Sequence, residues 1–174
     1  MPVNEFLVPG HATRREFAVY VVVANRREEN EFHLYVGKTG DNREGCNPVI
    51  SRAGNHFSYN EIHSQIRNKL PRHPSEYDYK YFYITFAPYS EIDLERAERV
   101  DVTNEMERAV NLAIQKEFPN LPEGCFLNKY KGTGHVKAEE REKRTDLRTA
   151  ERMVKVTALV EAVAKYVKSL SVAG

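Results

Sequence analysis

A short apolar run that stops abruptly at glycine constrains the fold of this chain more than any other feature. The run is Leu34-Tyr35-Val36, and Gly37-Lys38-Thr39-Gly40 follows it directly. Leucine, tyrosine and valine favour a half-buried strand, whereas glycine allows backbone geometry that other residues resist. A second β-rich run, at residues 17–24, precedes it across a polar connection. Two such runs predict a hairpin, which would bring Tyr20 and Tyr35 close together.

Length and composition set the broad limits. With 174 residues, 41% of them apolar, the chain has the right size for one hydrophobic core. Its 26 Lys and Arg residues nearly balance 25 Asp and Glu residues, so a polyanionic partner would have to be held by a local basic patch.

Its apolar runs predict neither a membrane partner nor secretion. They are shorter than the roughly 20 residues that cross a bilayer, and the N-terminus lacks the basic start and apolar segment of a secretion signal. The two cysteines, Cys46 and Cys125, lack metal-ligand spacing. We therefore expect two free thiols and a cytoplasmic location.

The predicted fold class is α/β, in the form of an α+β sandwich with a small, mainly antiparallel three-stranded sheet flanked by helices. Strands are expected at residues 17–25, 32–37 and 78–86, and the third is dense in aromatic and β-branched residues.

Two helices are expected between the second and third strands. Asn47 followed by Pro48 predicts a helix that begins at Pro48. In it, Arg52 and His56 are four residues apart and therefore share one face. A second helix is predicted from about Tyr59 to Leu70, because Ser58 and Glu61 have the spacing of a capping box and apolar residues follow at helical intervals.

Two further helices are expected in the second half of the chain. Apolar residues recur at helical spacing from Val102 to Phe118, and Pro119 ends the pattern; residues 91–98 fit either a loop or a short helix. A long C-terminal helix is predicted from Lys137 onward. Its later part carries an apolar stripe that must pack either on its own domain or on a partner subunit. The stripe consists of Met153, Val156, Leu159, Val160, Val163, Tyr166, Val167 and Leu170.

An ordered set of short motifs resembles the GIY-YIG nuclease superfamily. Its members are Ala18-Val19-Tyr20, Tyr35-Val36-Gly37 followed by Lys38-Thr39, Arg52 with His56, Glu107 and Leu127-Asn128. Alanine and valine stand where the first family motif has glycine and isoleucine, whereas the tyrosine is kept. The resemblance divides the chain into a lead-in at residues 1–16, a nuclease-like domain at 17–135 and a helical extension at 136–174.

The resemblance implies a role for each motif residue. Glu107 would be both a catalytic residue and the ligand of Mg²⁺ or Mn²⁺, with Glu105 as a rival carboxylate. Arg52 would stabilise charge on a phosphate. Tyr20 would help to deprotonate water, and Tyr35 and His56 would orient or relay that proton.

Two further residues would bind the substrate. They are Lys38 and Asn128, and Asn120 is a rival for the asparagine role. The function implied is a metal-dependent endonuclease that hydrolyses DNA phosphodiester bonds as a monomer or homodimer. The alternative is a catalytically silent nucleic-acid-binding or protein-interaction module on the same fold.

Overall fold

The computed structural model describes residues 3–26, 29, 31–40, 46–60, 62, 64–128, 142 and 144–170. Its centre is an antiparallel sheet of three strands in the order β2-β1-β3. The strands are β1 (Glu16–Arg26), β2 (Glu31–Lys38) and β3 (Asp78–Pro88). The predicted hairpin and the predicted α+β class, with its three-stranded sheet, are confirmed.

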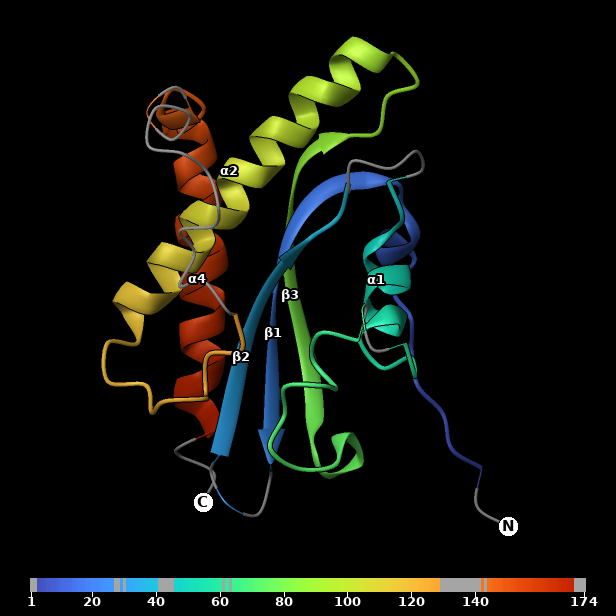
Figure 1. Cartoon of the computed structure of the whole chain (residues 1–174), viewed down its shortest axis with the longest axis vertical. Coiled ribbons are helices and arrows are strands. Elements are labelled where there is room, and N and C mark those ends of the chain that lie inside the picture. The colour runs from blue at the N-terminus through green and yellow to red at the C-terminus, as the bar shows by residue number, and fades with distance from the viewer. Residues whose placement is uncertain are drawn as a thin grey trace.

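Helices cover both faces of the sheet (Figure 1). The short helix α1 (Val49–Asn55) lies on one side, and α2 (Asp93–Glu117) and α4 (Ala150–Leu170) lie on the other. Two 3-10 turns, η1 (Gly10–Thr13) and η2 (Pro74–Glu76), complete the described elements. None of the described helices combines the length and the apolar character that crossing a membrane requires.

The central strand β1 is apolar on both faces because both are covered. Val19, Val21 and Val23 belong to the cluster with α2 and α4, whereas the alternate residues Tyr20 and Val22 belong to the cluster on the other face. This double burial explains why residues 17–24 form a continuous apolar run instead of an alternating one.

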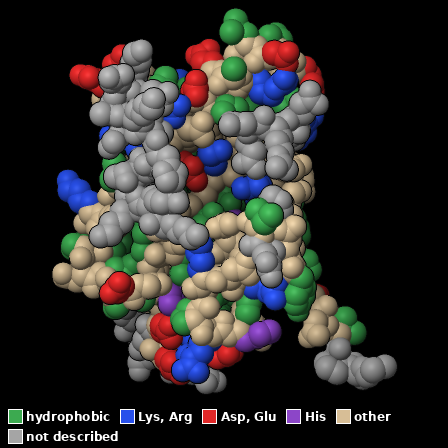
Figure 2. Space-filling view, viewed as in Figure 1, with side chains coloured by type: hydrophobic (Ala, Val, Ile, Leu, Met, Phe, Trp, Pro, Cys, Tyr) green, Lys and Arg blue, Asp and Glu red, His purple; other side chains and the backbone are tan. Residues whose placement is uncertain are grey.

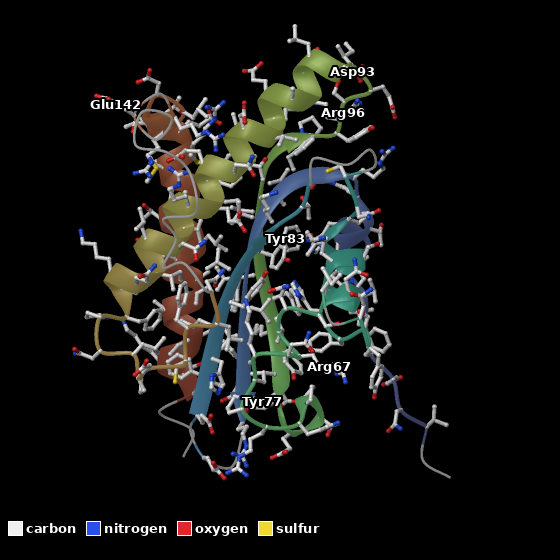
Figure 3. The ribbon with its side chains drawn as sticks, viewed as in Figure 1. Arg67, Tyr77, Tyr83, Asp93, Arg96 and Glu142 are labelled. Atoms are coloured by element: carbon white, nitrogen blue, oxygen red, sulfur yellow. The ribbon has the colours of Figure 1, made fainter. Side chains whose placement is uncertain are left out.

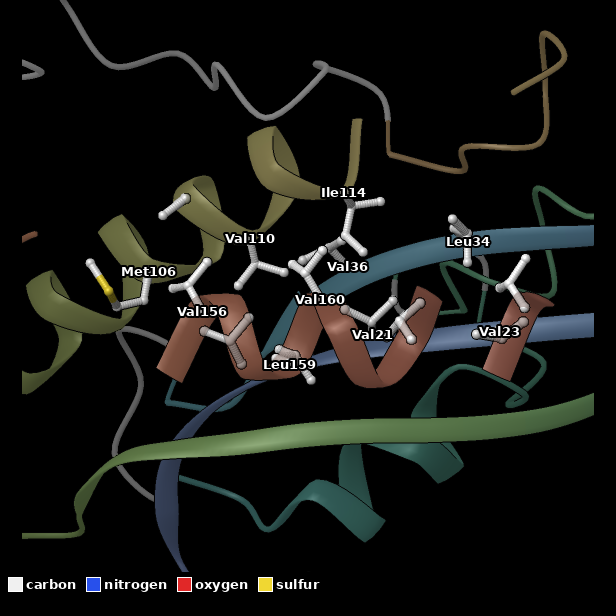
Figure 4. Packing of buried hydrophobic residues seen from close by; sticks show 14 of the residues in the cluster. Val21, Val23, Leu34, Val36, Met106, Val110, Ile114, Val156, Leu159 and Val160 are labelled. Carbon is white, nitrogen blue, oxygen red and sulfur yellow. The ribbon is translucent and has the colours of Figure 1, made fainter. Parts of the chain in front are cut away.

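Helix α4 packs on its own domain. Its buried residues Val156, Leu159 and Val160 meet Val110 of α2 and Val21 of the sheet in one continuous core (Figure 4). Of the two alternatives for the C-terminal stripe, the structure therefore shows packing within the chain. The predicted helix from Lys137 is interrupted, since residues 146–149 are not helical and α4 begins at Ala150; residues 137–141 and 143 lie outside the described part.

The helix predicted from Tyr59 to Leu70 is wrong. Of the described residues in this segment, 62 and 65–69 lie in turns, and 59, 60, 64 and 70 are not helical. The reason is tertiary hydrogen bonding, because the amide of Arg67 donates to the carbonyl of His56 at 3.2 Å and its Nη1 donates to the carbonyl of Ser58 at 3.2 Å. These bonds fold the segment back on the end of α1, a use of the backbone that helical periodicity does not reveal. Glu61, the predicted capping partner, lies outside the described residues.

Several boundaries differ from the sequence-based expectation. Helix α1 begins at Val49 with Pro48 as its N-cap residue, one position later than predicted. Helix α2 begins at Asp93, which shows that most of residues 91–98 are helical. It ends at Glu117, and Phe118 before Pro119 is its C-cap. Cys46 and Cys125 are free thiols, as expected.

Candidate active site

A hydrogen bond between Tyr20 and His56 lies at the centre of the candidate site. The Tyr20 hydroxyl and Nε2 of His56 are 2.7 Å apart, although 36 positions separate the residues in the sequence. The antiparallel register pairs Tyr20 with Gly37 and Val22 with Tyr35, so both tyrosines lie on one face. The Tyr35 ring meets the His56 ring edge-on at 4.9 Å between centroids and the Tyr20 ring at 6.4 Å.

The close approach of Tyr20 to β2 explains why residue 37 is glycine. A Cβ atom on Gly37 would lie 2.5 Å from both Cζ and the hydroxyl oxygen of Tyr20. Real Cβ atoms do not come this close to other heavy atoms. The glycine of the second motif therefore makes room for the tyrosine of the first, in a position from which the hydroxyl reaches His56.

Replacing Gly37 with alanine is therefore expected to disturb this arrangement. The Tyr20 ring contacts the rings of Tyr35, Tyr81 and His56, which restrict its movement away from β2. We expect Gly37→Ala to lower the free energy of unfolding by about 1–3 kcal/mol, the usual range for overpacking a core, as measured by urea denaturation.

Gly54 of α1 provides the matched control. A Cβ atom there meets nothing within 4 Å. Gly54→Ala is expected to stabilise the protein by about 0.5–1 kcal/mol, since alanine is the better helix former. Equal urea midpoints for Gly37→Ala and the parent would contradict this prediction, because they would show that Tyr20 makes room for the Cβ atom without loss of stability.

Charges on both sides of the sheet act on the Tyr20 phenol. Burial raises the pKa of Tyr20 well above its ordinary value of 10.0, and Tyr35 raises it further; Arg52 of α1 lowers this pKa and Glu107 of α2 raises it. Tyr20 has no exposed surface. The phenol is therefore protonated at neutral pH and has a hydrogen that it can donate to His56. Arg52 and Glu107 are therefore near enough to Tyr20 for their charges to change its pKa.

His56 is neutral in this environment. Burial lowers its pKa from 6.5 to about 4, and the positive charges of Arg52 and Lys69 contribute. A neutral ring whose Nε2 accepts the hydrogen bond from Tyr20 carries its own hydrogen on Nδ1. The Nδ1 atom is buried and has no hydrogen-bond partner among the described residues. The ring therefore has capacity to accept a proton from Tyr20 and a second nitrogen that a water molecule or substrate atom would satisfy.

The lowered pKa of His56 makes protein stability depend on pH. Below pH 6.5 the unfolded chain binds a proton at this histidine that the folded chain excludes until about pH 4. The folded protein keeps its full stability above pH 6.5. As the pH falls from 6.5 to about 4, the free energy of unfolding is expected to decrease by about 3 kcal/mol. Urea denaturation at a series of pH values measures it as the difference between the parent and His56→Gln, whose curve should be flatter. Parallel curves would contradict it.

Asn128 bonds to the backbone of β2, and its predicted contact with a substrate stays a prediction. Its Oδ1 accepts from the amide of Val36 at 2.8 Å and its Nδ2 donates to the carbonyl of Val36 at 2.7 Å. The preceding residues also bond to β2: the amide of Leu34 donates to the carbonyl of Cys125, and the carbonyl of Leu34 accepts from the amide of Leu127. Asn128 thus holds the strand that carries Tyr35 and Gly37. The rival Asn120 is exposed on the loop after α2.

Lys38 lies at the end of β2, on the opposite face from Tyr35 and Gly37. The pairing of Lys38 with Val19 places it on the side of α2, and its Nζ lies 3.4 Å from the carbonyl oxygen of Gly40. Its predicted contact with a phosphate stays a prediction.

The structure distinguishes the two carboxylates that were predicted as rival metal ligands. Glu105 is completely buried, and its Oε1 accepts from Nε of Arg148 at 2.7 Å. Nη1 of Arg108 lies 3.3 Å from its other oxygen. Glu105 therefore belongs to a buried ion-pair group beneath the C-terminal region, whereas the charge of Glu107 acts on Tyr20.

Comparison with known proteins gives no further identification. No family model, curated protein or solved structure matches this chain. The assignment of roles therefore rests on the motif residues and on the geometry described above.

Sequence reasoning missed two residues of the site. Lys69 acts on His56, and its Nζ lies 5.3 Å from the centre of the Tyr35 ring. Tyr81 of β3 lies 6.1 Å from Tyr20 between ring centroids. The alternation of Tyr79, Tyr81 and Tyr83 along β3, with Tyr77 just before the strand, was a usable signal for a tyrosine-lined face. Lys69 had no such signal. Figure 2 shows Lys and Arg side chains on the face of the molecule turned to the viewer.

Proposed function

We propose that this chain is a GIY-YIG-type endonuclease that hydrolyses DNA phosphodiester bonds with a divalent metal ion. The observation that carries the proposal is the Tyr20–His56 hydrogen bond, which has Tyr35 packed against it and is subject to the charges of Arg52 and Glu107. Tyr20, Tyr35 and His56 come from three segments that are distant in the sequence.

The residues present fit a magnesium or manganese ion that is shared with the substrate. Within the described ranges, no group of three or more His, Cys, Asp or Glu side chains forms a cage for a metal. Mg²⁺ commonly takes only one or two carboxylates and completes its shell with water and substrate phosphate, and Mn²⁺ also suits oxygen ligands. Glu107 would hold the ion. When bound, the ion would stabilise negative charge on the phosphate oxygens.

Tyr20 and His56 would handle the proton of the attacking water. Tyr20 takes a proton from water as it passes its own proton to Nε2 of His56, which becomes an imidazolium. Arg52 and Lys69 oppose that positive charge in the free protein, and a bound phosphate offsets them. Because Tyr20 is completely buried, water reaches its hydroxyl only if the residues above it shift when DNA binds.

Arg52 would bind the phosphate group. Its planar, permanently charged guanidinium suits an oxygen whose charge grows during the reaction. It extends from α1, one turn before His56, so a phosphate near Arg52 also lies near the histidine that receives the proton.

The second candidate function is a catalytically silent nucleic-acid-binding or protein-interaction module. The complete burial of Tyr20 favours it, since a tyrosine that only packs and donates one hydrogen bond would look the same. The two functions differ in whether the chain breaks a phosphodiester bond.

Incubation of plasmid DNA with the 174-residue chain and Mg²⁺ or Mn²⁺ separates the two functions. Cleavage by the parent and none by Glu107→Ala, with both proteins folded by circular dichroism, supports the nuclease. A folded parent that cleaves nothing with either ion supports the silent module.

A further inference from the structure

Beside the candidate site, an exposed tyrosine carries an arginine on one face of its ring. The guanidinium carbon of Arg67 lies 3.9 Å from the centre of the Tyr59 ring. Tyr59 is nevertheless 85% exposed, so the ring face opposite the guanidinium is open to solvent. Ile62, three positions later, is 75% exposed. Apolar side chains this exposed next to a candidate site suggest a contact with a ligand.

The segment that carries this pair is fixed to the candidate site. It starts at His56, whose carbonyl accepts from the amide of Arg67. Ser64 is buried and bonds to Ser58 through both hydroxyls at 2.9 Å. Phe57 packs edge-on against Tyr79 of β3 with 4.5 Å between ring centroids. These contacts anchor the base of the segment while Tyr59 projects outward, and Figure 3 shows Arg67 on the α1 side of the sheet.

Positive charge connects the exposed pair with the site. Lys69 follows two residues after Arg67 and acts on both Tyr35 and His56. Arg52 acts on the same histidine from α1. A nucleic-acid strand whose scissile phosphate meets Arg52 would therefore continue past Lys69 toward Arg67 and the open face of Tyr59. An aromatic ring beside backbone-binding cations is the arrangement on which unpaired bases stack.

We infer that Tyr59, backed by Arg67, is a stacking platform for an unpaired base of the DNA substrate. This rests on the proposed function, and it specifies a substrate class: DNA with an unpaired nucleotide a short distance from the cleaved phosphate. In a fully paired duplex every base is already stacked, so the platform favours substrates with a bulged, flipped or single-stranded base.

The test is a binding measurement with the 174-residue chain carrying Glu107→Gln, so that cleavage does not consume the probe. Fluorescence anisotropy is recorded at one fixed salt concentration with two labelled duplexes. One has a single unpaired thymine, and the other has an abasic site in its place. Tyr59→Ala is expected to weaken binding of the first by about 5- to 150-fold and to leave binding of the second unchanged.

Two controls define the effect. Tyr59→Phe, which keeps the ring, is expected to bind as the parent does. Leu94→Ala on α2 removes another side chain that is 82% exposed and is expected to have no effect on either probe. Circular dichroism and melting temperature confirm that each variant is folded.

The outcomes separate this inference from the nuclease itself. Equal losses on both probes, or no loss, would overturn the stacking platform even if the parent cleaves plasmid. A sedimentation change in Tyr59→Ala without the thymine-specific loss would overturn it too, and would mark the surface as a contact between copies. A parent that cleaves neither plasmid nor the duplex with the unpaired thymine, while Tyr59→Ala loses thymine-specific binding, would reject the nuclease and retain the platform.

Discussion

Replacing Glu107 with glutamine is expected to remove most metal-dependent DNA cleavage, by about 10²- to 10³-fold, while the protein stays folded. Glutamine keeps the size of the side chain and removes the negative charge that would bind the ion. Glu107 is only half-buried on α2, so its replacement leaves the core intact. The measurement is the initial rate of plasmid cleavage at saturating Mg²⁺, together with the melting temperature of each protein.

Arg52→Ala is the companion variant. It is expected to lose activity over a similar range, because it removes the cation that would meet the phosphate. Cleavage by Glu107→Gln at the parent rate would reject Glu107 as the metal ligand. Glu105 would not be the natural replacement, because its carboxylate is bonded to Arg148.

The second large effect is expected at Glu105, two positions from Glu107, and it concerns stability. Glu105→Ala is expected to lower the free energy of unfolding by about 3–5 kcal/mol. The buried guanidinium of Arg108 would lose its partner, and Arg148 would lose the bond that ties residues before α4 to α2. A charge left unpaired in the interior is much more costly than a lost surface ion pair.

Urea denaturation measures this difference, and Glu117→Ala is the matched control. Glu117 lies on the same helix and also faces a cation from the C-terminal region, since Nζ of Lys168 is 3.8 Å away. Both side chains of that pair are partly exposed, so its loss is expected to cost no more than about 1 kcal/mol. Similar midpoints for the two variants would show that the Glu105 group contributes no more than a surface pair.

The sequence predicted the elements whose signals are local. Alternation and apolar runs located all three strands, and the hairpin followed from the spacing of the first two. The juxtaposition of Tyr20 with Tyr35 could therefore be predicted. That of Arg52 with His56 could also be predicted, because four residues make one helical turn.

The features that the sequence did not predict depend on contacts between residues far apart in the chain. Residues 59–70 have helical periodicity, yet hydrogen bonds from Arg67 to the end of α1 determine their path. The contribution of Lys69 depends on that path and was not predictable. Glu105 and Glu107 look equivalent in the sequence, and the burial of Glu105 beside Arg108 and Arg148 distinguishes them in the structure. The bond of the Asn128 amide to a backbone 92 positions away could not be predicted either, because nothing in a sequence shows such a bond.

The bonds between Asn128 and Val36 have a consequence for association between molecules. As the outer strand of the sheet, β2 has a row of backbone donors and acceptors on which another chain could form an additional strand. Residues 125–128 occupy part of that row through the parallel bridge of Leu34 with Phe126, and the Asn128 amide extends the pairing by imitating a peptide group. One side chain thus blocks, at the strand that carries Tyr35, the intermolecular sheet growth that leads to aggregation.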